Sequence, residues 1–319
     1  MKNITVFLTT AFVMTFYAKA SAQLLMENFD YGTSTGDLTS LTSNWSVHSG
    51  SGTPEQYLTT SLLYTGYIGS SVGGSVSFAG GSGSRQDINR KFSDSIAVTS
   101  TVYISFLVNL SSAGSSDYFF HAGSRSLGLT YRARVFARDT SSGTGWAFGL
   151  SKSNESAVLD TTILEYNRTY LIVLKYEFSV NADDDDQITL YAYDGEVPTV
   201  EPGSPIVTIG PVGSGVGGDL SDIGSVAIRQ GSNSAVGIVD GIRVDTTWNL
   251  VSGLPVVSDF YPIDSLKIND ERGVPLKLND TVNTTGIVTS IRQLGAGTSG
   301  PGTIQNNRPP GQRYWWGRL

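Results

Sequence analysis

Residues 101–110 read Thr-Val-Tyr-Ile-Ser-Phe-Leu-Val-Asn-Leu, and this stretch decides the fold. Its apolar side chains recur at every second position, at Val102, Ile104, Phe106, Val108 and Leu110. Successive side chains of an extended chain point to opposite faces, so a period of two predicts a strand with one buried face. Such a strand needs neighbouring strands and a second layer to cover its apolar side.

The same period of two continues along the chain. Residues 129–138 place Leu129, Tyr131, Ala133, Val135 and Ala137 on one side, and Thr130, Arg132, Arg134, Phe136 and Arg138 on the other. Residues 146–150 continue the pattern, and the first half of 170–178 is apolar on both sides, which is typical of a central strand. Further short strands are expected at 188–193, 206–209, 225–229 and 237–244.

The segments between these strands are turns. Residues 111–117, 140–145 and 213–219 are rich in Gly, Ser, Asn and Asp, and no segment has a convincing helical period. The sequence therefore predicts an all-β fold, a two-sheet antiparallel jelly-roll sandwich. We expect the following side chains to be buried between its sheets: Phe106, Val108, Ile172, Leu174 and Tyr176.

Several short motifs carry a family resemblance. They are Glu27-Asn28-Phe29-Asp30-Tyr31, Leu63-Tyr64-Thr65-Gly66-Tyr67, the strand at 170–176, Glu201-Pro202, and Val239-Asp240-Gly241-Ile242-Arg243-Val244 followed by Trp248. In this order they resemble the concanavalin A-like, laminin G-like jelly-roll modules of secreted bacterial proteins, over about 24–251. The resemblance implies one concave sheet often used for glycan binding, and often a calcium ion at the rim. It does not imply catalysis, because the Glu-x-Asp-x-Glu strand of the glycosidases is missing from this sequence.

The N-terminus predicts export. Lys2 precedes an apolar run from Ile4 to Tyr17, and Ala20-Ser21-Ala22 precedes Gln23, so residues 1–22 are read as a signal peptide cleaved after Ala22. The alternative, a single-pass anchor, is disfavoured because the run is short and lacks a charged stop. We expect the mature protein to be secreted, extracellular or on the outer cell surface, without a membrane span.

Composition narrows the chemistry. The chain has no cysteine, which excludes thiol catalysis and Cys-ligated metals, and leaves an exported domain to hold itself together by burial alone. A net charge of −7 and a pI near 4.8 make nucleic acid an unlikely partner, because nucleic-acid-binding proteins concentrate Lys and Arg on one face.

The pattern of the sequence changes after Pro255. Residues 23–254 are assigned to the jelly roll, 255–262 to a linker, and 263–319 to a second module that resembles the start of an OB-fold and is incomplete. The tail ends with Tyr314-Trp315-Trp316-Gly317, where the OB-fold pattern has an apolar strand. A change of reading frame near Asn307 would explain this tail, and a genuine aromatic tail is the alternative.

The sequence offers no catalytic constellation. His48 and His121 are the only histidines, they are far apart in sequence, and neither lies near a Gly-x-Ser-x-Gly turn. Two histidines without cysteine are also too few ligands for a zinc site. We therefore expect no enzyme and no catalytic residues.

Calcium is the one metal that the sequence suggests. Asp183 to Asp186 form a run of carboxylates, and Asp183 and Asp185 are the candidate ligands, since calcium prefers several oxygen ligands. The run lacks the EF-hand spacing. The alternative is a solvated acidic loop between two strands, which is the commoner role of such runs.

A sugar site is predicted near the arginine-bearing strand. Its candidate residues are Tyr118, His121, Arg132, Arg134 and Trp146. Aromatic rings stack on the apolar faces of sugars, and polar side chains bind the hydroxyl groups. The alternative is that Trp146 belongs to the core and the arginines only keep an outer face soluble.

Together these features predict a secreted or cell-surface binding or adhesion protein whose partner is a glycan or a cell-surface polymer. One alternative is an accessory N-terminal part of a secreted hydrolase or nuclease whose catalytic domain lies elsewhere. The other alternative is a structural surface module without a small ligand.

Overall fold

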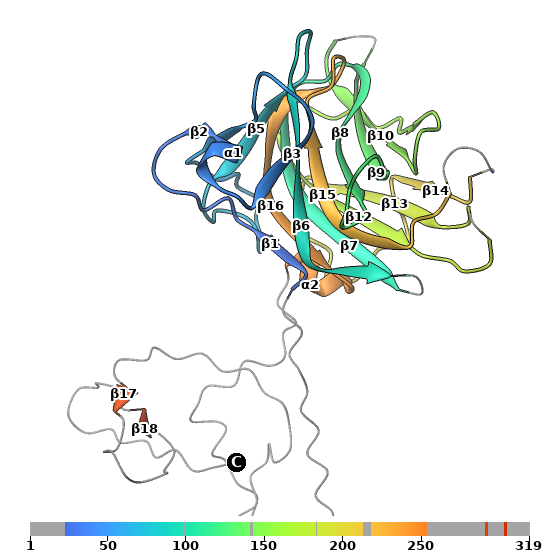
Figure 1. Cartoon of the computed structure of the whole chain (residues 1–319). Helices are drawn as coiled ribbons and strands as arrows, with labels where there is room; N and C mark the ends of the chain where they lie inside the picture. The colour runs from blue at the N-terminus through green and yellow to red at the C-terminus, as the bar shows by residue number, and fades with distance from the viewer. Residues whose placement is uncertain are drawn as a thin grey trace, which may run out of the picture. The chain divides into compact units, whose positions relative to one another are not determined.

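Strand pairing in the computed structural model gives two antiparallel sheets (Figure 1). The structure describes residues 23–97, 100–140, 143–182, 184–212 and 218–253, with the pairs 291–292 and 303–304. The predicted signal peptide, Asp183 and most of the predicted OB-like module lie outside the described residues. The chain divides into two units, Met1–Leu254 and Pro255–Leu319, and the sequence also changes character at Pro255.

The first sheet has nine strands. In order they are β14 (Val207–Ile209), β13 (Gln187–Tyr193), β12 (Thr169–Glu177), β7 (Thr101–Ser112), β16 (Val236–Asp245), β5 (Ser75–Ala79), β4 (Gln56–Leu58) and β2 (Gly36–Asp37), and β1 (Leu25–Glu27) also pairs with β16. The second sheet has seven strands. In order they are β11 (Val158–Leu159), β10 (Trp146–Ser151), β9 (Tyr131–Asp139), β8 (Ser115–Gly123), β15 (Asp222–Arg229), β6 (Gln86–Ala97) and β3 (Trp45–Gly50).

The main core lies between the two sheets. Phe106 of the nine-stranded sheet stacks on Phe120 of the seven-stranded sheet with ring centroids 4.1 Å apart, and Phe78 stacks on Phe119 at 5.4 Å. The side chains predicted to be buried are buried, namely Phe106, Val108, Ile172, Leu174 and Tyr176. The all-β two-sheet sandwich predicted from the period of two is therefore confirmed.

Helices are short in the described part of the chain. They are α1 (Leu38–Leu41) and α2 (Trp248–Ser252), and α2 ends at Gly253, whose φ of 83° is a left-handed conformation that favours glycine. Among the described residues, no helix is long and apolar enough to cross a membrane. The pairs in the second unit are β17 (Ile291–Arg292) and β18 (Thr303–Ile304), which are antiparallel to each other.

A second apolar cluster covers the outer face of the nine-stranded sheet. Trp248 of α2 packs on Tyr191 of β13 with ring centroids 5.2 Å apart, and Leu107, Leu171 and Val173 lie beneath it in the same cluster. The Tyr67 hydroxyl reaches Ser105 of β7 at 2.8 Å. This sheet is therefore covered on both of its faces.

Candidate functional site

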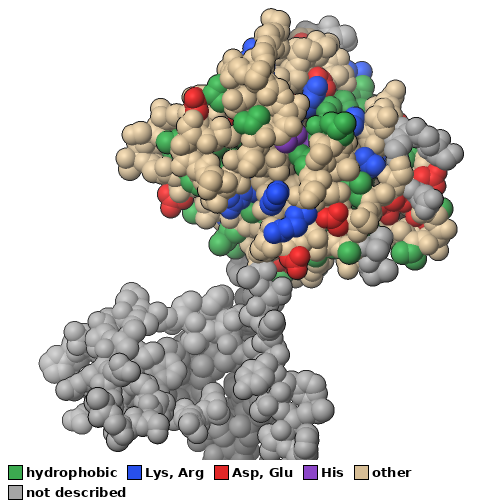
Figure 2. All heavy atoms as spheres, in the orientation of Figure 1, with side chains coloured by type: hydrophobic (Ala, Val, Ile, Leu, Met, Phe, Trp, Pro, Cys, Tyr) green, Lys and Arg blue, Asp and Glu red, His purple; other side chains and the backbone are tan. Residues whose placement is uncertain are grey.

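The outer face of the seven-stranded sheet carries a polar aromatic cluster. In β8 and β15, Phe120 pairs with Ile228 in the core, so the neighbouring pair of His121 and Ala227 faces outward. We call the following group the outer cluster: His48, Tyr118, His121, Tyr131, Arg134, Phe136 and Arg229. Figure 2 shows histidine atoms at the surface beside basic and hydrophobic side chains. Of the two histidines, His48 is half-buried and His121 is fully buried.

A β-bulge in β9 decides which arginine joins the outer cluster. Ala133 has a φ of 50°, and the register between β8 and β9 shifts between the pairs Phe120–Val135 and Ala122–Arg132. A bulge inserts an extra residue and reverses the alternation beyond it. Tyr131 therefore lies on the same face as Arg134, although simple alternation predicts opposite faces.

The same bulge makes the prediction for Arg132 wrong. Its side chain is buried and its guanidinium donates to the carbonyl oxygens of Tyr131 and Gly218. Its positive charge acts on Tyr176 in the core. Arg132 is therefore a structural residue at the end of the sandwich, and it does not share a surface with Arg134.

Ring contacts hold the outer cluster together. The ring centroid of His121 lies 4.5 Å from that of Tyr131, 5.7 Å from that of His48 and 5.7 Å from that of Tyr118. Phe136 extends this surface, with its ring 5.5 Å from Tyr118. The structure therefore brings the predicted residues Tyr118, His121 and Arg134 together, with Tyr118 and His121 buried and Arg134 half-buried, and their role in binding stays a prediction.

Two guanidinium groups lie over the tyrosine rings. The Cζ atom of Arg229 is 4.2 Å from the ring centroid of Tyr118, and that of Arg134 is 4.9 Å from it. The second ring near Arg134 is that of Tyr131, at 5.8 Å. Cation–π contacts of this kind hold a guanidinium in place while leaving its N–H groups free to donate.

The two arginines differ in their acidic partners. Arg229 forms ion pairs with Asp117 at 2.7 Å and with Asp87 at 3.8 Å. Arg134 has no carboxylate within ion-pair distance among the described residues. Burial lowers the pKa of Arg134 below its usual value, because a low-dielectric environment disfavours the charged form.

Both histidines of the cluster are held neutral. Burial lowers the pKa of His48 to about 4 and that of His121 to about 3, and the charge of Arg229 acts in the same direction on both. His121 Nδ1 lies 3.1 Å from the carbonyl oxygen of Ala122. A neutral imidazole that donates there keeps Nε2 as a hydrogen-bond acceptor.

Several nitrogen atoms of the cluster have no hydrogen-bond partner. They are Nδ1 and Nε2 of His48, Nε2 of His121 and Nε of Arg134. Buried polar atoms in native proteins are nearly always paired with protein or with water, and unpaired ones need an explanation. Their concentration beneath one open face points to a ligand or to water that completes them.

Sequence reasoning missed part of this cluster. Tyr131 was assigned to the other face because the bulge at Ala133 has no signature in the sequence. His48 lies on β3 and Arg229 on β15, far from β8 and β9 in sequence, and only the strand order of the sheet brings them together. The alternation that places Arg134 and Phe136 on one face was the usable signal.

Trp146 is not part of a surface site. It is fully buried in the main core, where its ring lies 4.4 Å from that of Phe148 and 5.8 Å from that of Tyr170. Its indole Nε1 donates to the carbonyl oxygen of Glu165 at 3.2 Å. The prediction of Trp146 as a ligand-binding residue is wrong, because its strand turns this side chain toward the opposite sheet.

Acidic residues gather at one end of the sandwich. Carboxylate oxygens of Asp185, Asp186 and Asp219 lie within 4.8 Å of one another. The buried ammonium of Lys152 is paired with Asp219. Asp185 accepts hydrogen bonds from Ser179 and from backbone N–H groups of its own loop. Calcium at this loop stays a prediction, and Asp183 lies outside the described residues.

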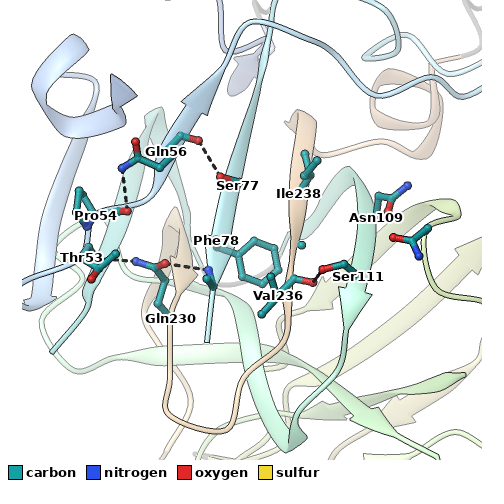
Figure 3. A pocket seen from close by; sticks show the side chains of 13 residues that line it. Thr53, Pro54, Gln56, Ser77, Phe78, Asn109, Ser111, Gln230, Val236 and Ile238 are labelled. Carbon is teal, nitrogen blue, oxygen red and sulfur yellow. Dashed lines mark hydrogen bonds between the residues drawn. The ribbon is translucent and has the colours of Figure 1, made fainter. Parts of the chain in front are cut away.

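A separate pocket of about 310 Å³ opens on the nine-stranded sheet (Figure 3). Amide and hydroxyl side chains line it beside Phe78, and Gln230 Nε2 donates to the carbonyl oxygen of Thr53 while its Oε1 accepts from the N–H of Ala79. Asn109 donates to Thr169 at 3.3 Å. These groups mainly bind the surrounding strands, so this pocket is less available to a ligand than the outer cluster.

Comparisons with known proteins give distant likenesses only. No family model and no curated protein sequence matches the chain. Among solved structures, the globular domain of calreticulin from T. cruzi has a TM-score of 0.43 at 12% identity, covering 73% of this chain and 91% of its own. The alginate lyase Aly36B has a TM-score of 0.40 at 12% identity, covering 69% of this chain and 95% of its own.

A carbohydrate-binding module, CBM66 from Bacillus subtilis, has a TM-score of 0.30 at 12% identity, covering 63% of this chain and 95% of its own. Likenesses this weak carry no argument about function. The fold rests on the strand pairing of this chain, and the function must be argued from its own side chains.

Proposed function

We propose that this protein is a non-catalytic carbohydrate-binding protein whose site is the outer cluster. One observation carries the proposal: the half-buried ring of Tyr131 and the half-buried guanidinium of Arg134 lie together, above buried nitrogen atoms without partners, on a sheet face that no apolar cluster of the described residues covers. A sugar offers apolar C–H faces that stack on aromatic rings and hydroxyl groups that both donate and accept hydrogen bonds. A sugar therefore matches both the aromatic rings and the polar groups of the cluster.

The charge state of the cluster supports binding over catalysis. A general acid or base works best when its pKa lies near the working pH, and the pKa values of about 4 for His48 and about 3 for His121 are far below neutrality. The two carboxylates on this face, Asp87 and Asp117, are engaged by Arg229.

The place of action belongs to the same proposal. Export would expose the outer cluster to glycans or polymers of a cell surface, so we propose an adhesive role outside the cell. Two other roles predict different results: an accessory part of a hydrolase would bind the polymer that its partner domain degrades, and a structural module would bind no glycan.

The test is a glycan array with the full chain and two matched variants. Tyr131→Ala removes a ring from the outer cluster, and Tyr193→Ala removes a half-buried ring from the nine-stranded sheet. Circular dichroism confirms that each variant is folded. We expect signals for the parent and for Tyr193→Ala, and at least a tenfold loss of affinity for Tyr131→Ala, the scale of losing one well-packed contact.

The proposal fails if the folded parent binds no glycan on the array. A loss of binding in Tyr193→Ala with binding retained in Tyr131→Ala would place the site on the other sheet and would also contradict it.

A further inference from the structure

We infer that the glycan bound at the outer cluster carries acidic groups, and that Arg134 is the residue that recognises them. This inference rests on the proposed function and names its ligand class: a polysaccharide with carboxylate or sulfate groups. The relevant observation is a half-buried guanidinium with no acidic partner among the residues that the structure describes.

Arg134 differs from the other cation in its cluster. Arg229 is neutralised by Asp117 and Asp87, whereas the guanidinium of Arg134 lies over the rings of Tyr118 and Tyr131 with no described carboxylate within ion-pair distance. Its Nε is buried and has no hydrogen-bond partner. Removing a charge from water is costly unless an opposite charge or hydrogen bonds compensate, so this arrangement is stabilised when a ligand supplies an anion.

The surroundings of Arg134 do not supply that anion. Glu155 acts on its charge from a distance, but the carboxylate of Glu155 accepts hydrogen bonds from the backbone N–H groups of Lys152 and Ser153. Arg132, on the inner side of the same strand, adds positive charge. The face therefore presents a positive guanidinium between two aromatic rings.

The geometry suits an acidic sugar. A guanidinium can donate two parallel hydrogen bonds to a carboxylate or a sulfate, which fixes orientation as well as charge. The ring of Tyr131, which is half-buried beside Arg134, then lies where the sugar ring that carries the acid would stack, while Tyr118 is buried beneath the two guanidinium groups.

A metal ion is a worse match for the same residues. His48 and His121 are the only histidines, and the positive charge of Arg229 lowers the pKa of both, as any cation nearby opposes another. No carboxylate joins them in a metal-binding group among the described residues. The electrostatics of the cluster therefore favour an anion.

The experiment measures affinity by calorimetry with paired ligands. Short oligogalacturonates are compared with their methyl esters, and sulfated galactan oligomers, which have no carboxylate, with their desulfated forms, so that the second member of each pair carries no charge. The protein is the full chain, with the variants Arg134→Gln, Arg134→Lys and the control Arg138→Gln, since Arg138 is an exposed arginine of the same strand.

We expect at least one acidic ligand to bind at least tenfold more tightly than its uncharged pair. Arg134→Gln should abolish this preference, Arg134→Lys should restore part of it because lysine keeps the charge but lacks the planar fork, and Arg138→Gln should leave it within about twofold. The two ligand pairs show whether carboxylate or sulfate is the recognised group.

The inference and the proposed function fail in different ways. Equal binding of charged and uncharged members, unchanged in Arg134→Gln, would overturn the inference and leave carbohydrate binding intact. A preference for acids that Arg138→Gln abolishes and Arg134→Gln does not would also overturn it. Absence of binding to these ligands and to a neutral glycan array would overturn both.

Discussion

The outer faces of the two sheets place a cation over a tyrosine ring in two different settings. On the nine-stranded sheet, Lys175 lies 5.9 Å from the ring centroid of Tyr103 and is paired with Glu201 and Glu177, each at 2.9 Å. On the seven-stranded sheet, Arg134 lies 4.9 Å from the ring centroid of Tyr118, with no acid in the described chain beside it.

This difference follows from what covers each face. The loop that carries Tyr64 and Tyr67, the segment that carries Glu201, and α2 with Trp248 lie over the nine-stranded sheet and bind most of its charged and hydroxyl groups, although the hydroxyl groups of Tyr64 and Tyr193 have no partner. Both Tyr103 and Tyr191 donate their hydroxyl groups to Glu201. Among the described residues, no such segment covers the seven-stranded sheet, and we propose that a ligand supplies the partner of its cation. A face whose charged groups are paired within the chain stabilises the fold. A face with an unpaired cation is available for binding.

The largest expected effect is the removal of the cover from the nine-stranded sheet. Trp248→Ala deletes a buried ring that contacts Tyr103, Tyr191 and Tyr193, and should lower the free energy of unfolding by about 3–5 kcal/mol. Denaturant unfolding measures the change. Glycan affinity of the folded fraction should stay within about twofold, and a larger loss would mean that the covered face takes part in binding.

The second prediction uses pH to separate the two faces. His48, with its pKa lowered to about 4, contributes stability that is present above its unfolded pKa near 6.5 and is lost as the pH falls through about 4. Asp240 lies under the loop of the covered face, where burial raises its pKa to about 7. Its contribution is present below its unfolded pKa near 3.8 and is lost as the pH rises through about 7.

Two variants should therefore change the slope of the free energy of unfolding against pH in opposite directions. Between about pH 4 and about pH 7, the contribution of His48 to the free energy of unfolding rises with pH, and His48→Gln removes it. The contribution of Asp240 falls over the same range, and Asp240→Asn removes it. Each contribution changes by roughly a few kcal/mol at most. Urea unfolding at several pH values gives the slopes. The assignment of these titrations to the two faces is contradicted if both variants change the slope in the same direction.

A third change weakens the acidic pairing of the cation on the covered face, so that its setting becomes more like that of Arg134. Glu201→Gln removes one of the two acids paired with Lys175 while keeping the size of the side chain. It should destabilise the protein by about 1–3 kcal/mol, the cost of leaving a largely buried polar group with poorer partners. The control is Arg168→Gln, because Arg168 pairs with acids at the exposed surface and should change stability by less than about 1 kcal/mol. Equal effects would show that the setting of the charge does not matter.

The smallest expected effect concerns calcium at Asp185, Asp186 and Asp219. A bound ion stabilises the native state by mass action, so EDTA should lower the melting temperature if calcium is held there. The Lys152 ammonium already pairs with Asp219 and donates to the carbonyl oxygen of Asp184, so we expect a shift of less than about 2 °C. A drop of several degrees that added calcium reverses would instead establish the sequence-based prediction.

The core could be predicted from the sequence and the site only in part. The alternation around Phe106 and the apolar run around Ile172 follow directly from burial between two layers, so these strands were found. Strand β8 was missed because its pairing with β9 shifts register three times, which removes the period of two. Trp146 and Arg132 were misplaced for a related reason: which face a residue occupies depends on bulges and on strand order, and local composition encodes neither.

Hydrogen–deuterium exchange with and without the best-binding oligosaccharide tests the central claim most directly. If the incomplete face is the binding face, the ligand should slow exchange in β8 and β9, residues 115–139, and in β3, residues 45–50, with no change in the covering loop at 60–72. Protection confined to the pocket of Figure 3, around residues 53–58 and 109–112, or to the covering loop, would contradict the account.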